Sequence, residues 1–188
     1  LRGLPDTLIL TPAMLLWINL VTDGPPALAL GMDPKSPDVM ARPPRSPDES
    51  VLDRSTVSLV LWIGVALTVA GLGLYGAEIW RGGHPLEART MLFTFLVTAE
   101  MGVLVVIRGR SGLTPLSNRW LLAAVAASLG LHLIVLYSPL SGPFAVRAPT
   151  LAQWYSILLA TAVFTALAWF GGRLFPVSSV ANQSARAL

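Results

Sequence analysis

The sequence predicts an all-α membrane protein with five transmembrane helices. Of its 188 residues, 54% are hydrophobic and only 12% are charged, whereas soluble domains carry about a quarter charged residues. Five apolar stretches are separated by polar breaks, several of them rich in proline. There is no cysteine, which excludes disulfide scaffolds, cysteine-based zinc sites and thiol nucleophiles. A lipid bilayer is therefore the expected environment.

Each apolar stretch reaches or approaches the roughly 20 residues that cross about 30 Å of hydrocarbon. Backbone amides find no water there, so each stretch is expected to be a helix. The third stretch is the shortest and has room to extend back toward Arg89. Aromatic rings that favour the membrane interface stand near the span ends: Trp80, Trp120, Tyr137 and Trp154. The predicted spans are about 8–31, 57–80, 91–107, 120–138 and 151–171.

The basic residues predict the orientation of these spans. The net charge is +3, but only one of the thirteen basic residues is lysine and they are spread singly, so nucleic acid is not an expected partner. Nine of them fall after the first, third and fifth spans: Lys35, Arg42, Arg45, Arg54, Arg108, Arg110, Arg119, Arg173 and Arg186. Four fall on the opposite side: Arg2, Arg81, Arg89 and Arg147. This bias places the N-terminus outside and the C-terminus in the cytoplasm.

The segments between the spans are too small for a catalytic domain. The run 32–47 contains five prolines and is expected to be an extended cytoplasmic connector, because proline interrupts helices. The chain starts with Leu1 rather than methionine, and we expect a segment of a longer protein. Any nucleotide chemistry would be carried out elsewhere in that protein.

The first span carries three oxygen-bearing side chains on one predicted helical face, because Asn19, Thr22 and Asp23 stand at positions i, i+3 and i+4. Pro25 and Pro26 lack the N–H groups that would bond the carbonyls of Val21 and Thr22. The helix is therefore expected to unwind after Asp23 and to leave these carbonyls in need of partners.

A broken helix that presents carbonyl, hydroxyl and carboxylate oxygens in the membrane is typical of cation transporters. An all-oxygen set suits calcium, magnesium, manganese or alkali ions better than soft metals. The alternative is a proline kink whose Asn19 and Thr22 only bond neighbouring helices. That alternative leaves Asp23 without a partner, since no basic residue lies inside any predicted span.

Of the ten acidic residues, only Asp23 and Glu100 fall well inside a predicted span. Glu100 and Asp23 would repel each other in an apolar interior, so at least one is expected to be protonated unless a cation lies between them. This predicts an exchange of protons for cations; a permanently protonated Glu100 is the alternative. His132 is interpreted as a packing histidine, Glu78 as reaching the interface, and Arg108, Arg110 and Arg119 as lipid headgroup contacts.

These residues resemble the sixth transmembrane helix and its following loop in P-type cation-transporting ATPases. Within that family the sequence is most similar to calcium pumps of the sarcoplasmic/endoplasmic-reticulum kind and their prokaryotic relatives. The resemblance covers nearly the whole chain, and the stretch NLVTDG is its most specific part. The similar stretches are 16–24 (LWINLVTDG), 26–31 (PALALG), 40–45 (MARPPR), 97–101 (VTAEM), 131–137 (LHLIVLY) and 151–154 (LAQW).

The resemblance implies transmembrane helices six to ten of a pump, with calcium as the transported ion. Asn19 and Asp23 match ligands of the inner of two calcium sites, and Thr22, Asp23 and Glu100 match ligands of the other. Magnesium and ATP would be required by the missing domains, since the phosphorylation motif DKTGT does not occur in this sequence. The implied partners are the lipid bilayer and the N-terminal part of the pump, with its first five transmembrane helices and cytoplasmic domains. A bacterial plasma membrane is the expected location.

Two departures leave the ion and the number of sites open. Pro25 stands where the reticulum pumps have leucine, and the version with two prolines is similar to secretory-pathway pumps, which bind one calcium and also carry manganese. Val103 stands where the reticulum pumps have asparagine. An alternative function is a membrane module without catalysis, such as a split subunit or remnant. A secondary transporter would show an inverted repeat, and the sequence has none.

Overall fold

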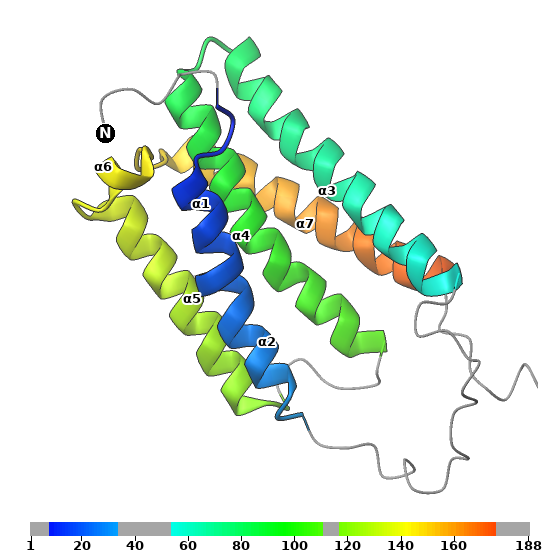
Figure 1. Cartoon of the computed structure of the whole chain (residues 1–188). Coiled ribbons are helices and arrows are strands. Elements are labelled where there is room, and N and C mark those ends of the chain that lie inside the picture. The colour runs from blue at the N-terminus through cyan, green and yellow to red at the C-terminus, as the bar shows by residue number, and fades with distance from the viewer. Residues whose placement is uncertain (1–7, 34–53, 111–116, 176–188) are drawn as a thin grey trace, which may run out of the picture.

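The computed structural model describes residues 8–33, 54–110 and 117–175, and regular structure in these ranges is entirely helical (Figure 1). Five helical spans are long and apolar enough to cross a membrane. This confirms the predicted all-α membrane fold. Most of the predicted connector 32–47 lies outside the described residues.

The first span, Pro12–Leu30, is made of three consecutive helical pieces. These are α1 (Pro12–Trp17), a π-helical turn η1 (Ile18–Asp23) and α2 (Gly24–Leu30). The span begins at a capping box, in which the Thr11 hydroxyl accepts a hydrogen bond from the Met14 N–H at 3.3 Å. Pro12 occupies the first turn, where its missing N–H costs nothing. These local signals place the start of the span four residues later than predicted.

The other spans are single long helices. They are α3 (Arg54–Trp80), α4 (Pro85–Arg110), α5 (Arg119–Tyr137) and α7 (Leu151–Leu174). A short α6 (Ser141–Phe144) lies between α5 and α7. The predicted third span, 91–107, was too short, because α4 already begins at Pro85, a residue suited to the first turn of a helix.

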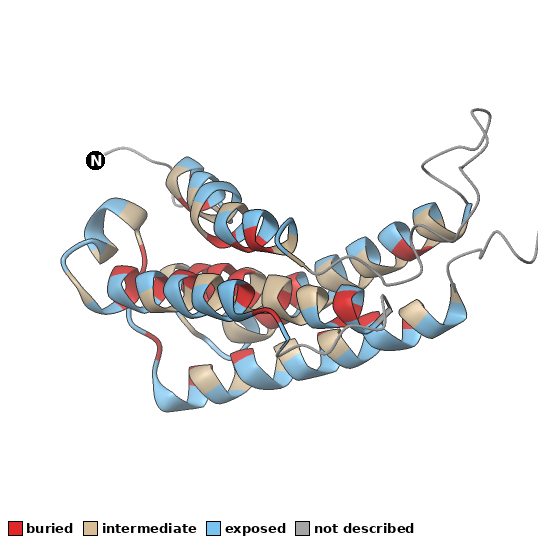
Figure 2. Cartoon of the chain, turned by 90° about the horizontal axis from the view of Figure 1, so that it is seen from below, coloured by how far each residue is buried: buried red, intermediate tan, exposed pale blue. Residues whose placement is uncertain are grey.

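Helix α4 lies at the centre of the bundle, between α3 and α7 on one side and the first span and α5 on the other (Figure 1). Half of its span is buried, against 28% or less for each of the other four. Buried residues gather along the middle of the bundle, while the outer helix faces are exposed (Figure 2). A polar group on the inner faces of α4 is therefore shielded by protein on several sides.

Two apolar clusters hold α4 in place. The first joins it to α3 and α7 and includes Leu74, Leu92, Phe95, Ile157 and Phe164. The second joins it to α1, α5 and the segment after α6 and includes Met14, Phe93, Val97, Val135 and Val146. Because α4 belongs to both clusters, it connects the two halves of the bundle.

Small residues and hydroxyl groups allow close helix contacts. The Trp62 indole of α3 lies over Gly171 of α7 and donates a hydrogen bond to the Leu167 carbonyl at 2.9 Å. The Thr98 and Thr161 hydroxyls of α4 and α7 lie 2.7 Å apart. Such contacts are typical of helices packed inside membranes.

The structure tests the predictions made for His132 and Arg108. His132 is buried and its Nε2 lies 3.2 Å from the Thr94 hydroxyl of α4, which confirms a packing histidine. The prediction that Arg108 contacts lipid headgroups was wrong. Arg108 is 2% exposed and forms an ion pair with Asp33. Its charge is buried because the extra turn at the end of α4 brings it against the end of the first span.

Candidate ion-binding site

The backbone of the first span changes its hydrogen-bond pattern next to the prolines. Pro25 cannot donate to the Val21 carbonyl, and the Ser128 hydroxyl of α5 donates to that carbonyl instead, at 2.7 Å. The prediction that Val21 needs a new partner is thus confirmed. Ser128 itself was missed, although a serine within an apolar span is a recognisable signal in the sequence.

The predicted unwinding after Asp23 was wrong. The chain stays helical, because Pro25 and Pro26 fall in the first turn of α2, where a missing N–H is tolerated. The departure from α-helical geometry lies before them, in the π-helical turn η1, which has wider spacing between its hydrogen-bonded residues. Single π-helical turns inside α-helices are often found at functional sites.

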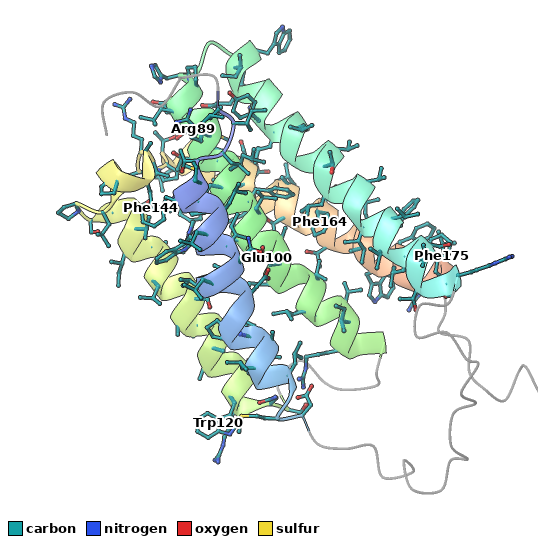
Figure 3. The ribbon with its side chains drawn as sticks, in the orientation of Figure 1. Arg89, Glu100, Trp120, Phe144, Phe164 and Phe175 are labelled. Carbon is teal, nitrogen blue, oxygen red and sulfur yellow. The ribbon has the colours of Figure 1, made fainter. Side chains whose placement is uncertain are left out.

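Thr22 and Glu100 meet at this turn. Thr22 is 1% exposed, and its Oγ1 lies 2.7 Å from Glu100 Oε2 on α4. The same Oγ1 lies 2.7 Å from the Ile18 carbonyl oxygen, one turn back along the first span. In Figure 3 the Glu100 side chain lies between α4 and the first span. The structure therefore brings together two of the four predicted ligands.

The Thr22 hydroxyl has one proton for these two acceptors. If it donates to the Ile18 carbonyl, the short contact to Glu100 requires a proton on the carboxyl group, which then donates to Thr22 Oγ1. If it donates to Glu100 instead, the carboxyl group can be ionised. The geometry thus fits either protonation state of Glu100 with a small rotation of one hydroxyl group.

Asn19 and Asp23 lie on the exposed side of the same turn. Asn19 Nδ2 donates to the Leu15 carbonyl at 2.8 Å, which leaves the amide oxygen, the better cation ligand, directed elsewhere. Among the described residues, no hydrogen-bond donor reaches the Asp23 carboxylate. Asp23 is close enough to Glu100 for their charges to interact. An exposed carboxylate on a membrane span is costly in lipid and needs a polar partner.

The four oxygen-bearing side chains therefore divide into a contacting pair, buried Thr22 and half-buried Glu100, and an exposed pair, Asn19 and Asp23. Within the described ranges, no group of three or more histidine, cysteine, aspartate or glutamate side chains is placed to hold a metal ion. The set consists of two carboxyl groups, from Asp23 and Glu100, and two neutral oxygens, from Thr22 and Asn19. Such a mixture can bind a hard cation if further oxygens join it.

Comparison with known proteins gives consistent matches. The family model described as "Cation transporting ATPase, C-terminus" matches residues 7–173. Calcium-transporting ATPase 4, endoplasmic reticulum-type, of Arabidopsis thaliana is 30% identical over 216 residues, covering 83% of this chain and 20% of that protein. Calcium-transporting ATPase 2 of the same type and organism is 29% identical, covering 85% and 21%.

A bacterial protein matches as well. The calcium-transporting ATPase of Bacillus subtilis (strain 168) is 37% identical over 166 residues, covering 84% of this chain and 18% of that protein. The chain thus spans about a fifth of the length of these relatives. From the family match, the relatives and the five membrane-length helices, we conclude that the chain belongs to the P-type cation-transporting ATPases of the calcium-pump type, as a C-terminal transmembrane region.

Proposed function

We propose that this chain supplies part of the ion site of an ATP-driven calcium pump. The observation that carries the proposal is the 2.7 Å contact between Thr22 and Glu100 at a π-helical turn that also bears Asp23. The names of the plant and bacterial relatives support calcium as the transported ion. ATP and magnesium would act in domains outside this chain. The proposed ligands are Asn19, Thr22, Asp23 and Glu100.

The exposed side of the turn supports a site completed by other parts of the pump. Calcium takes six to eight oxygen ligands at about 2.3–2.6 Å, more than this turn and Glu100 can readily supply. The remaining oxygens would come from helices that cover Asn19 and Asp23. These helices would also shield the Asp23 carboxylate from lipid. The same helix contact would thus supply the missing oxygen ligands and give Asp23 a polar environment.

Glu100 supports a counter-movement of protons. In the empty site a proton on Glu100 would be donated to Thr22 Oγ1, and the Thr22 proton to the Ile18 carbonyl. Binding of calcium would favour the ionised carboxylate, so the Glu100 proton would leave as the cation enters. The Thr22 oxygen would then have a lone pair for the cation. Each calcium bound at this carboxylate would thus displace one proton.

The protein is an integral multi-pass membrane protein, and its placement in the membrane is part of the proposal. The distribution of basic residues supports an outside N-terminus and a cytoplasmic C-terminus. A bacterial plasma membrane is the proposed location, and one of the relatives is a bacterial protein. The partners would be lipid and the N-terminal part of the pump.

The substitution Asp23→Asn in the full-length pump tests the proposal. It keeps the size of the side chain and removes the charge, so calcium-dependent phosphorylation by ATP should be lost. Glu87→Gln is the matched control, because Glu87 pairs with Arg147 away from the turn. Calcium-dependent phosphorylation at the wild-type level in Asp23→Asn would reject the proposed site. An independent start site in the coding DNA, with no DKTGT motif upstream, would instead support a non-catalytic module.

A further inference from the structure

A buried ion pair joins the end of the first span to the end of α4. Arg108 Nη1 donates hydrogen bonds to both carboxylate oxygens of Asp33, at 2.5 Å and 2.7 Å. Arg108 Nη2 donates to the Ser117 hydroxyl at 2.7 Å. The side chain of Asp33 is 15% exposed and that of Arg108 only 2%. The two charges therefore meet largely away from solvent. Asp33 follows the last residue of α2 by three positions.

Asn118 extends this contact to α5. Its Nδ2 donates to Asp33 Oδ1 at 2.7 Å and to the Ala29 carbonyl of α2 at 2.8 Å. Its Oδ1 accepts hydrogen bonds from the N–H groups of Trp120 and Leu121 in the first turn of α5. The network thus joins the ends of α2 and α4 to the start of α5.

The two joined helices are those that bring Thr22 and Glu100 together. Arg108 lies eight residues after Glu100 on α4, or about 12 Å along the helix axis. Asp33 lies eleven residues after Thr22 in the first span and its following turn. If α2 and the adjoining turn η1 slid past α4 by one helical turn, about 5.4 Å, the Thr22 hydroxyl of η1 would lose its contact with Glu100.

The π-helical turn gives α2 a particular need for such an anchor. Because η1 departs from the regular α-helical pattern, the position of α2 is not fixed by simple continuation of α1. Apolar contacts between helices are weakly directional, whereas Arg108 bonds Asp33 through Nη1 and Ser117 through Nη2. Charge-assisted hydrogen bonds of this kind are short and add geometric specificity. Buried ion pairs are poor sources of stability, and their best-attested use is to select one arrangement over others.

We propose that Arg108 and Asp33 are positioning residues for the ion site, which set the axial register at which Thr22 meets Glu100. This inference rests on the proposed function. It predicts that the pair controls the affinity for the cation through geometry, although neither residue contacts the site. Loss of partners that hold ligands in place typically lowers metal affinity about 10- to 100-fold.

The main test replaces both charges in the full-length pump, as Arg108→Met with Asp33→Leu. Replacing a buried ion pair by apolar residues of similar volume is usually well tolerated, so this variant should fold. We expect its calcium concentration for half-maximal ATPase activity to rise about 10-fold, with the maximal rate nearly unchanged. Arg119→Met is the matched control, since Arg119 is exposed near the same end of the bundle. Unchanged calcium activation in the folded double variant would overturn the proposal.

A second variant removes one charge only and is the more severe test, because it leaves the buried Arg108 charge without its counter-ion. Asp33→Asn keeps the volume of the side chain and removes its charge, and it should also raise the half-activating calcium concentration. Unchanged activation in this variant would equally count against positioning. If neither variant yields folded protein, the pair serves folding and the proposal is wrong.

A cross-linking measurement reads the register without relying on transport. With Thr22→Cys and Glu100→Cys in one protein, a short bifunctional thiol reagent should join the two positions when Arg108 and Asp33 are present, and much less in the double variant. Equal cross-linking in both backgrounds would reject the register claim. If Asp23→Asn retains calcium activation while cross-linking depends on Arg108 and Asp33, the proposed ion site fails and the register claim stands.

Discussion

The hydroxyl of Thr22 lies 2.7 Å from Glu100 Oε2, although 78 residues separate them in the sequence. The contact joins a π-helical turn of the first span to the central helix α4. Both residues belong to membrane-length helices, where a hydroxyl–carboxyl pair has little competition from water.

Removing the Thr22 hydroxyl should weaken calcium activation. Thr22→Val keeps the shape of the side chain but takes away an oxygen that contacts Glu100 and is a proposed ligand. We expect the half-activating calcium concentration of the full-length pump to rise about 10-fold. Thr68→Val is a suitable control, because Thr68 is exposed on α3 and bonds only its own helix, at the Gly64 carbonyl. Equal activation curves for the two variants would contradict a role for the Thr22 oxygen.

Ser128→Ala should destabilise the π-helical turn. It removes the donor to the Val21 carbonyl, which Pro25 cannot replace. An unsatisfied buried carbonyl costs about 1–3 kcal/mol, so the unfolding temperature of the detergent-solubilised pump should fall. The control Ser156→Ala removes a hydroxyl that bonds only the Ala152 carbonyl of its own helix, α7. A loss of stability no greater than that of the control would show that the turn does not depend on Ser128.

Gly171→Ala should push α3 and α7 apart. A methyl group at this position would collide with the Trp62 indole and disturb its hydrogen bond to the Leu167 carbonyl. Overpacking of this kind costs about 1–3 kcal/mol, which a thermal unfolding measurement can detect. At Gly73 of α3 an added methyl group meets no atom within 4 Å, so Gly73→Ala should not destabilise the protein. Similar unfolding temperatures in the two variants would contradict the close contact at Gly171.

The ion pair of Asp33 should be insensitive to pH across the neutral range. Hydrogen bonds from Arg108, together with one from Asn118 and the Arg108 charge, hold the pKa of Asp33 below its ordinary value of 3.8. Its contribution to stability is therefore complete above pH 3.8 and is lost only as the pH falls through the lower pKa of the folded state. Acid unfolding of wild type and Asp33→Asn should differ by a constant amount above pH 5 and converge below pH 3.8. A difference that shrinks between pH 7 and 5 would contradict this assignment.

The number and helical nature of the spans could be predicted from sequence because bilayer thickness and backbone hydrogen bonding leave few alternatives. The importance of the segment around Asp23 was also recognisable, since an acid followed by two prolines is rare in a membrane span. The unwinding was predicted wrongly for a local reason. Pro25 and Pro26 interrupt the preceding turn but are compatible with the first turn of a new helix.

Contacts between residues far apart in the chain could not be predicted from the sequence. Arg108 looked like a headgroup contact because nothing in its local sequence indicates Asp33, 75 residues away. Ser128 satisfies the Val21 carbonyl across 107 residues. Hydropathy patterns predict which segments enter the membrane, but the partner of each polar group depends on how the helices pack.

The most direct test of the proposed site is equilibrium calcium binding to the full-length pump, measured for wild type, Asp23→Asn and the Glu87→Gln control. The proposed ligand set predicts that wild type and Glu87→Gln bind calcium alike and that Asp23→Asn loses bound calcium under the same conditions. Equal stoichiometry and affinity in all three proteins would contradict an ion site at the π-helical turn.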